Sequence, residues 1–216
     1  MYRSLLVVFL LLIWVPWGPW GSWGLMAGEL SPEEMRRLEK RFVQTQQSIR
    51  TLRADFEQVI RMPGMRDPVV SRGEFLYRAP DDLRVTFTDP PGDYLLLRGD
   101  TFEMARAGKP PARKPSTDRS ARALVAIRKV LRGEPESLED KMDHKISRLD
   151  QEFVVSLTPV TRSPQLPEKI ENRVDAETLL LRNMTITLPR GMFLEYRFSR
   201  PRRNIPLDGT LFQLRS

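Results

Sequence analysis

The stretch Gly73–Thr88 reads G-E-F-L-Y-R-A-P-D-D-L-R-V-T-F-T and decides the fold that we predict. Five large apolar residues recur in it at every second position, on either side of a polar turn: Phe75, Tyr77, Leu83, Val85 and Phe87. Because successive side chains of a strand point to opposite faces, these five share one apolar face of a hairpin, and the other face is expected to be polar and solvated. Pro80 restricts the backbone, and Asp81 and Asp82 can accept hydrogen bonds from nearby N–H groups, so the turn lies at these residues. A sheet with one apolar face requires a second layer.

The same alternation predicts strands before and after this hairpin. The candidates are Thr51–Arg61, Tyr94–Leu97, Thr101–Met104, Lys145–Asp150, Phe153–Pro159, Lys169–Asp175, Thr178–Pro189 and Met192–Ser199. Apolar sets share a face in the last two of these strands: Met184 with Ile186, and Leu194 with Tyr196 and Phe198. Two segments that contain Pro and Gly are predicted loops, the second of them an exposed, mobile connector: Met62–Arg72 and Ala105–Ser116.

Two amphipathic helices are predicted, one before the first strand and one in the middle of the chain. Ser31 is a good N-cap, and Glu34 three residues later completes a capping box, so the first helix runs from there to about Ser48. The second lies within Ser116–Arg132, and a short helical turn is expected at Ser137–Asp143. The apolar face of the second helix contains Ala121, Leu124, Ile127 and Leu131. Grouped helices with consecutive antiparallel strands indicate the α+β class, in which helices lie over a curved sheet or open barrel.

The N-terminal segment has the pattern of a secretory signal peptide. A positively charged start precedes the unbroken apolar run Leu5–Val15, and an end rich in Pro and Gly follows. We predict a signal peptide over residues 1–27, with cleavage after Gly24 or Ala27, and one domain over residues 28–216. The alternative is a membrane anchor, because the same segment is long enough to cross a bilayer.

Composition and motifs exclude several classes of function. The absence of Cys excludes disulfides, thiolate metal sites, a Cys nucleophile and the lipid-modified cysteine of a bacterial lipoprotein. The net charge is +7, but basic and acidic residues are intermixed, which is typical of a solvated surface and not of a nucleic-acid footprint. Glu139, Asp143 and His144 form the one ligand-like group, but adjacent side chains point apart and the chain has no second His. We therefore predict no metal, no cofactor and no enzyme activity.

Several segments resemble one known family in their order and spacing. They are Leu52-Arg-Ala-Asp-Phe-Glu-Gln58, Gly73–Pro80 with Leu83–Phe87, Tyr94–Thr101, Phe153–Pro159, and Tyr196–Ser199 with Asn204, Leu207 and Phe212. Together they cover most of Ser31–Leu214 and are similar to the periplasmic outer-membrane lipoprotein carrier protein family, LolA. The resemblance implies an unclosed antiparallel β-barrel, that is, a curved sheet, covered by a lid of helices. It also implies an apolar interior that takes acyl chains.

The resemblance implies a carrier, or chaperone, that binds the acyl chains of lipoproteins in the periplasm and shuttles them from the inner to the outer membrane. Its implied partners are acylated lipoproteins or other lipids, an inner-membrane ABC-type release complex and an outer-membrane acceptor. We expect a monomer that binds no nucleic acid. The alternatives are a carrier for another lipid or glycolipid, and a lipid-sensing envelope regulator with the same fold.

The candidate lipid-binding residues are apolar side chains that are expected to face the interior. They are Phe56, Phe75, Tyr77, Val85, Phe87, Met184, Ile186, Leu194, Tyr196 and Phe198. The family typically has an arginine directly before the hairpin proline, where it helps to lock the lid, but this chain has Ala79 there and Arg78 one residue earlier. Because an offset of one residue turns a strand side chain to the opposite face, Arg78 is expected to point to solvent. The role of the family's arginine at the lid therefore cannot be transferred to Arg78.

Overall fold

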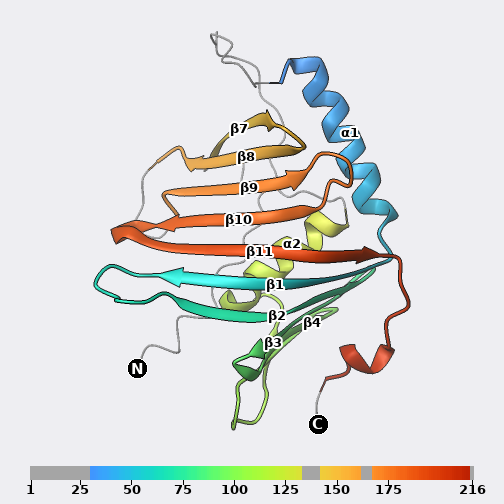
Figure 1. Cartoon of the computed structure of the whole chain (residues 1–216). Helices are drawn as coiled ribbons and strands as arrows, with labels where there is room; N and C mark the ends of the chain where they lie inside the picture. The colour runs from blue at the N-terminus through green and yellow to red at the C-terminus, as the bar shows by residue number, and fades with distance from the viewer. Residues whose placement is uncertain (1–29, 133–141, 162–166, 215–216) are drawn as a thin grey trace.

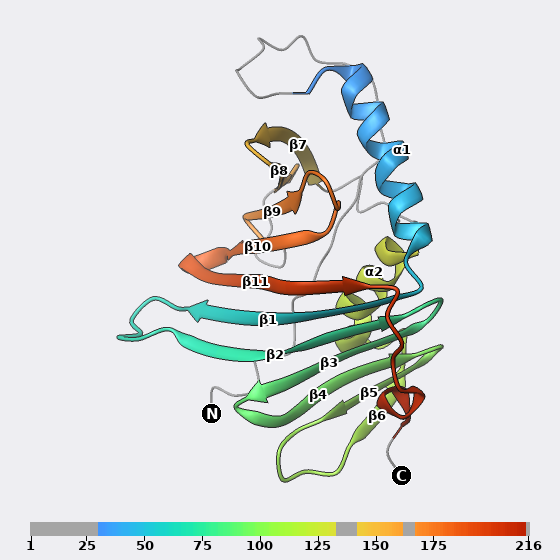
Figure 2. The same ribbon diagram turned by 45° about the vertical axis from the view of Figure 1, so that its right-hand side comes forward.

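The computed structural model describes residues 30–132, 142–161 and 167–214, which form one large antiparallel sheet with few helices (Figure 1). The strands are β1 (Thr51–Arg61), β2 (Val69–Arg78), β3 (Asp82–Asp89), β4 (Pro91–Arg98), β5 (Thr101–Ala105), β6 (Ala112–Pro115), β7 (Met142–Leu149), β8 (Glu152–Pro159), β9 (Lys169–Asp175), β10 (Leu181–Leu188) and β11 (Met192–Arg203). Their order is β6-β5-β4-β3-β2-β1-β11-β10-β9-β8-β7. The sheet curves but does not close, so β6 and β7 are its edges (Figure 2). The predicted α+β fold with an unclosed, curved antiparallel sheet is confirmed.

The first and last strands of the sheet in sequence order, β1 and β11, pair at its centre. All other neighbouring strands follow one another in sequence, whereas β1 pairs with β11 in antiparallel register. In that register Phe56 lies opposite Phe198, and Ile60 lies opposite Leu194. This pairing places strands β1–β6 and strands β7–β11 side by side, so one interior receives side chains from both halves of the chain.

Most element boundaries agree with the sequence prediction, and the differences follow from strand pairing. The predicted loop 62–72 is wrong from Val69 onward, because Val69 and Val70 pair with the last residues of the long strand β1. The predicted connector 105–116 remains exposed but contains β6, which pairs with β5. The helical turn predicted for Ser137–Asp143 is wrong at its last two residues, which pair with β8 in strand β7, and its remainder lies outside the described residues.

Helices α1 (Pro32–Ser48) and α2 (Arg122–Leu131) occupy the two helical segments that the sequence predicts. The capping box of α1 is formed, since the Ser31 N–H donates to the Glu34 carboxylate at 2.8 Å and the Ser31 hydroxyl accepts from the Glu34 N–H at 3.3 Å. The Ser31 hydroxyl, which donates to the Glu34 carboxylate at 2.7 Å, and the Ser31 N–H lower the pKa of Glu34. A short 3₁₀ turn, η2 (Arg119–Ala121), leads into α2. Within the described ranges no helix combines the length and the apolarity needed to span a membrane; the predicted signal peptide lies outside them.

One face of the sheet forms the main hydrophobic core with α2. The four apolar residues that the sequence places on one face of the second helix, Ala121, Leu124, Ile127 and Leu131, are all buried there. The hairpin β2–β3 contributes as predicted: Phe75 lies opposite Val85, and Tyr77 lies opposite Leu83. Figure 1 shows α2 across the middle of the sheet, whereas α1 runs beside the strands of the C-terminal half. The helices therefore cover different parts of one interior.

The opposite face of the hairpin is not the solvated surface that the sequence predicts. Leu76, Tyr94, Leu96, Ala105 and Phe212 form a second buried cluster there. Phe212 belongs to the short 3₁₀ helix η5 (Gly209–Phe212), which brings the C-terminal segment back over β2–β5. A pattern of alternation does not reveal this second layer, because η5 lies more than a hundred residues away from the hairpin in the sequence.

The expectation that Arg78 points to solvent is wrong. Its side chain does lie on the face opposite the main core, but it forms an ion pair with Asp82, and its guanidinium lies 4.6 Å from the centre of the Phe212 ring. Arg84 donates from Nη1 to the Leu211 carbonyl at 2.6 Å. The basic residues of β2 and β3 thus hold the C-terminal turn against the sheet, through charge-assisted hydrogen bonds and cation–π contact.

Candidate functional site

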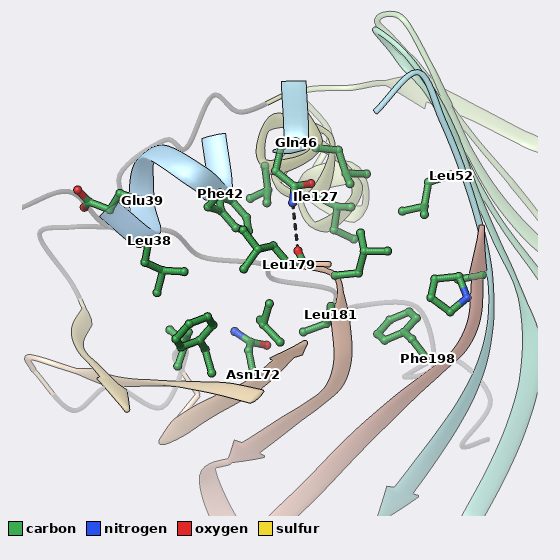
Figure 3. A pocket seen from close by; sticks show the side chains of 18 of the residues that line it. Leu38, Glu39, Phe42, Gln46, Leu52, Ile127, Asn172, Leu179, Leu181 and Phe198 are labelled. Atoms are coloured by element: carbon green, nitrogen blue, oxygen red, sulfur yellow. Dashed lines mark hydrogen bonds between the residues drawn. The ribbon is translucent and has the colours of Figure 1, made fainter. Parts of the chain in front are cut away.

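A cavity of about 140 Å³ lies between α1 and the C-terminal half of the sheet (Figure 3). Helix α1 contributes Leu38, Phe42 and Gln46 to its wall, and α2 contributes Ile127, Val130 and Leu131. The opposite wall contains Phe153, Val155, Asn172, Val174 and the segment Leu179–Leu181, together with Phe198 from β11. Almost all of the lining is apolar, so the cavity favours an apolar ligand.

The cavity exists because α1 is amphipathic and lies along the sheet only at one side. Leu38, Phe42 and Gln46 recur at a spacing of four residues, so they occupy one stripe of the helix and turn toward the sheet together. Ile49 ends the helix with an extended backbone, after which β1 begins at Thr51. The connection between α1 and β1 is therefore very short.

Polar links hold α1 to the turn between β9 and β10. Gln46 donates from Nε2 to the Leu179 carbonyl at 3.3 Å, and this bond is drawn in Figure 3. Arg41 donates to the carbonyls of Ala176 and Glu177 at 3.2 and 3.3 Å. Asp175 shapes the turn, because it accepts from the Thr178 N–H at 2.7 Å. This hydrogen bond holds the pKa of Asp175 far below its usual range, together with the hydrogen bonds that Arg182 and the Thr178 hydroxyl donate to the same carboxylate.

Stronger polar links hold α2 to the tips of two hairpins. Arg128, which is 8% exposed, donates from Nη1 to the Gly99 carbonyl at 2.5 Å and lies 3.8 Å from Asp81. Arg132 lies 3.2 Å from the same carboxylate. Ala79, the residue before the hairpin proline, packs against the main core. In this part of the structure the arginines therefore lie on the helix and the acceptors on the sheet.

The structure brings all ten candidate residues into the main core or against it. Eight of them are buried or packed among other core side chains and do not line the cavity: Phe56, Tyr77, Val85, Phe87, Met184, Ile186, Leu194 and Tyr196. Phe75 and Phe198 do line it, and their rings meet edge to face with centroids 6.5 Å apart. A role in lipid binding remains a prediction for each of them, and Phe75 and Phe198 are the two in direct reach of a ligand in this cavity.

Sequence reasoning missed most of the residues that form the cavity wall. Phe42 and Leu38 were recognisable only as the apolar stripe of a helix. Asn172 carried a clearer signal, because Ile170, Asn172 and Val174 alternate along β9 and an amide therefore interrupts an apolar face. A polar side chain on the buried face of a strand requires a hydrogen-bond partner, so such an interruption indicates a candidate binding group.

Two ionisable side chains near the interior have raised pKa values. Burial raises the pKa of Tyr196 to about 12, so its hydroxyl stays neutral, and it accepts a hydrogen bond from Gln58. Glu39 lines the cavity, and burial raises its pKa. Of the metal-ligand group suggested by the sequence, Glu139 lies outside the described residues, and in the part that the structure describes no three His, Cys, Asp or Glu residues come together to hold a metal ion. The site is suited to binding an apolar chain.

Comparison with known proteins places this architecture in a family. Residues 47–215 match the family described as "Outer membrane lipoprotein carrier protein LolA". No curated protein sequence was found to match the chain. Among solved structures, an uncharacterized conserved protein from Thermus thermophilus has a TM-score of 0.54 at 9% identity, with 84% of this chain and 94% of that chain covered.

Two further structures are similar at comparable identity. A DUF1329 family protein from Desulfovibrio piger has a TM-score of 0.50 at 14% identity, and 84% of this chain and 96% of that chain are covered. MucB has a TM-score of 0.52 at 14% identity, and 85% of this chain and 64% of that chain are covered. At such identities the likeness shows the fold alone. Because the family match extends over most of the chain and the curved sheet agrees with it, this chain belongs to the LolA family.

Proposed function

We propose that this protein is a periplasmic carrier that binds the acyl chains of lipoproteins in the cavity under α1 and shuttles them from the inner to the outer membrane. The observation that carries the proposal is the apolar cavity between a lightly attached helix and a curved sheet. Each buried CH₂ contributes about 0.8 kcal/mol, so an acyl chain gains affinity from such a wall without any catalytic group. Membership of a family described as an outer membrane lipoprotein carrier supports the same function.

The cavity is too small to hold a whole long acyl chain, so uptake of the cargo requires the protein to open. Its volume of about 140 Å³ is close to that of the engineered protein cavities of ~150 Å³ that bind one benzene molecule. The closed form therefore holds only part of a long acyl chain. Helix α1 is the element that can move to admit the rest, because the exposed Arg41 and the single buried amide of Gln46 link it to the β9–β10 turn and its C-terminal end leads directly into β1. The carrier would act as a monomer that exchanges cargo with an inner-membrane ABC-type release complex and an outer-membrane acceptor.

The test is a matched pair of substitutions on α1. Phe42→Asp places a charge on the cavity wall, whereas Gln44→Asp places the same side chain on the exposed side of the same helix. Binding of a fluorescent N-palmitoylated peptide is expected to weaken at least about tenfold for Phe42→Asp, since a carboxylate opposes burial of an acyl chain. The control is expected to bind like the unmodified protein, and circular dichroism should show both variants folded. Equal binding by the two variants would contradict the proposed site.

The predicted signal peptide defines a second measurement. If the chain is exported, the mature protein should begin at Leu25 or Gly28, because cleavage is expected after Gly24 or Ala27. Intact-mass analysis of the protein isolated from a periplasmic extract is expected to show one of these two forms. Recovery of the chain from Met1 in the membrane fraction would instead support the anchor alternative and would contradict a soluble carrier.

A further inference from the structure

Asn172 is a buried amide in the apolar wall of the cavity. It is 4% exposed, and its Oδ1 atom has no hydrogen-bond partner. Its cross-strand neighbours in the register are Val155 on one side and Met184 on the other, so the adjacent side chains supply no polar group. Figure 3 shows the Asn172 side chain among the apolar residues of the cavity, between Leu38 and Leu181. An unpartnered polar group thus faces the space that the proposed cargo would occupy.

The described groups around Asn172 provide no hydrogen-bond donor for its Oδ1 atom. The backbone of β9 pairs with β8 on one side and with β10 on the other, so the backbone groups beside Asn172 are used in the sheet. Gln46 also lines the cavity, but it donates from Nε2 to the Leu179 carbonyl and makes no hydrogen bond to Asn172 Oδ1. A buried water usually needs about two to four polar partners, and this apolar wall provides few. A polar group on the ligand is the partner that fits.

We propose that the cargo is an acyl chain that carries a hydrogen-bond donor, a hydroxyl or an amide N–H, which donates to Asn172 Oδ1. This inference rests on the proposed function, because it concerns the ligand of the same cavity. A donor on the ligand satisfies the buried oxygen, whereas a plain hydrocarbon chain leaves it unpaired in an apolar environment. The cavity therefore selects hydroxylated or amide-linked acyl chains over unsubstituted ones. A site built for a hydrogen bond discriminates against an analogue that lacks the matching group.

The experiment compares ligands of one chain length that differ by a single donor. Hexadecanoic acid, 3-hydroxyhexadecanoic acid, methyl hexadecanoate and N-methylhexadecanamide each compete with the fluorescent palmitoylated peptide. The first pair isolates the hydroxyl and the second isolates the amide N–H, so the two pairs distinguish the sources of the donor. A preference of about tenfold for the donor-bearing member of at least one pair is expected.

Two variants test whether Asn172 is responsible. Asn172→Leu replaces the amide by an apolar group of similar shape, so it is expected to abolish the preference, to bind the plain chain more tightly and to remain folded. Asn183→Leu makes the same change on β10, at a residue whose amide donates to Glu195 at 2.9 Å, and is expected to keep the preference. The inference is overturned if the unmodified protein binds both members of each ligand pair equally well. It is also overturned if Asn172→Leu keeps the preference. Neither result contradicts the proposed carrier function. If the palmitoylated peptide does not bind at all, the carrier function itself is wrong.

Discussion

Replacement of Gly73 by alanine is expected to lower the free energy of unfolding by about 3 kcal/mol, because overpacking costs this much when backbone must move. A Cβ atom at this position would lie 2.2 Å from the Thr86 carbonyl oxygen and 2.5 Å from Cζ of Phe56. The first of these is backbone and cannot rotate away. The second belongs to a ring that is itself packed edge to face against Phe87, at 5.4 Å between centroids.

The register explains why this glycine is needed in a strand. Phe56 on β1 and Phe87 on β3 both lie opposite Gly73 on β2, so the two rings share the space that a side chain would otherwise fill. The suitable control is Gly209→Ala, where the nearest atom to the new Cβ is the end of the flexible Arg78 side chain at 3.3 Å. Urea denaturation should show a loss of less than about 1 kcal/mol for this control. A similar loss for both variants would mean that the rings do not depend on Gly73.

The second large effect is expected at Arg128. Arg128→Met keeps the aliphatic volume but removes the hydrogen bond to the Gly99 carbonyl and the interaction with Asp81. Hydrogen bonds to charged groups contribute about 1.5–3 kcal/mol, so a loss of about 2 kcal/mol in the free energy of unfolding is expected. The loss of stability is limited because Arg128 Nε is buried without a hydrogen-bond partner. Removal of this atom is favourable by itself.

Arg132→Met is the matched control for this second prediction. Arg132 contacts the same Asp81 carboxylate, but its side chain is 35% exposed, and water competes for such a pair. A loss of less than about 1 kcal/mol in urea denaturation is expected. If the two variants lose equal stability, the buried link to Gly99 is not what holds α2 in place.

These contacts assign different roles to the two helices. Buried groups and the main core attach α2 to the sheet, whereas the links of α1 to the β9–β10 turn are made by an exposed arginine and one amide. Elements with few buried contacts open at low free-energy cost. We therefore expect α1 to open and close the cavity while α2 remains in place.

Local chemistry in the sequence was sufficient to predict most of the elements and the buried face of the central hairpin. The capping box at Ser31 and Glu34 predicts the start of α1, and the alternation around Phe75 and Val85 predicts the hairpin and its buried face. Both are short-range effects, since capping involves four residues and strand alternation has a period of two. For the same reason the curved antiparallel sheet was predictable as a class, and the resemblance to the family strengthened that prediction.

Only the tertiary structure decided which apolar side chains fill the core and which line a cavity. Tyr196 and Phe198 share one face of β11, yet Tyr196 is in the core and Phe198 reaches the cavity. That difference depends on the curvature of the sheet and the distance at which α1 lies above it, which no local pattern encodes. No local pattern encodes the packing of Phe212 on the opposite face of the sheet or the hydrogen bond from Arg128 to the Gly99 carbonyl either. Both contacts join segments that are far apart in the chain. Alternation fixes the direction of a side chain, whereas packing between distant segments determines what that side chain meets.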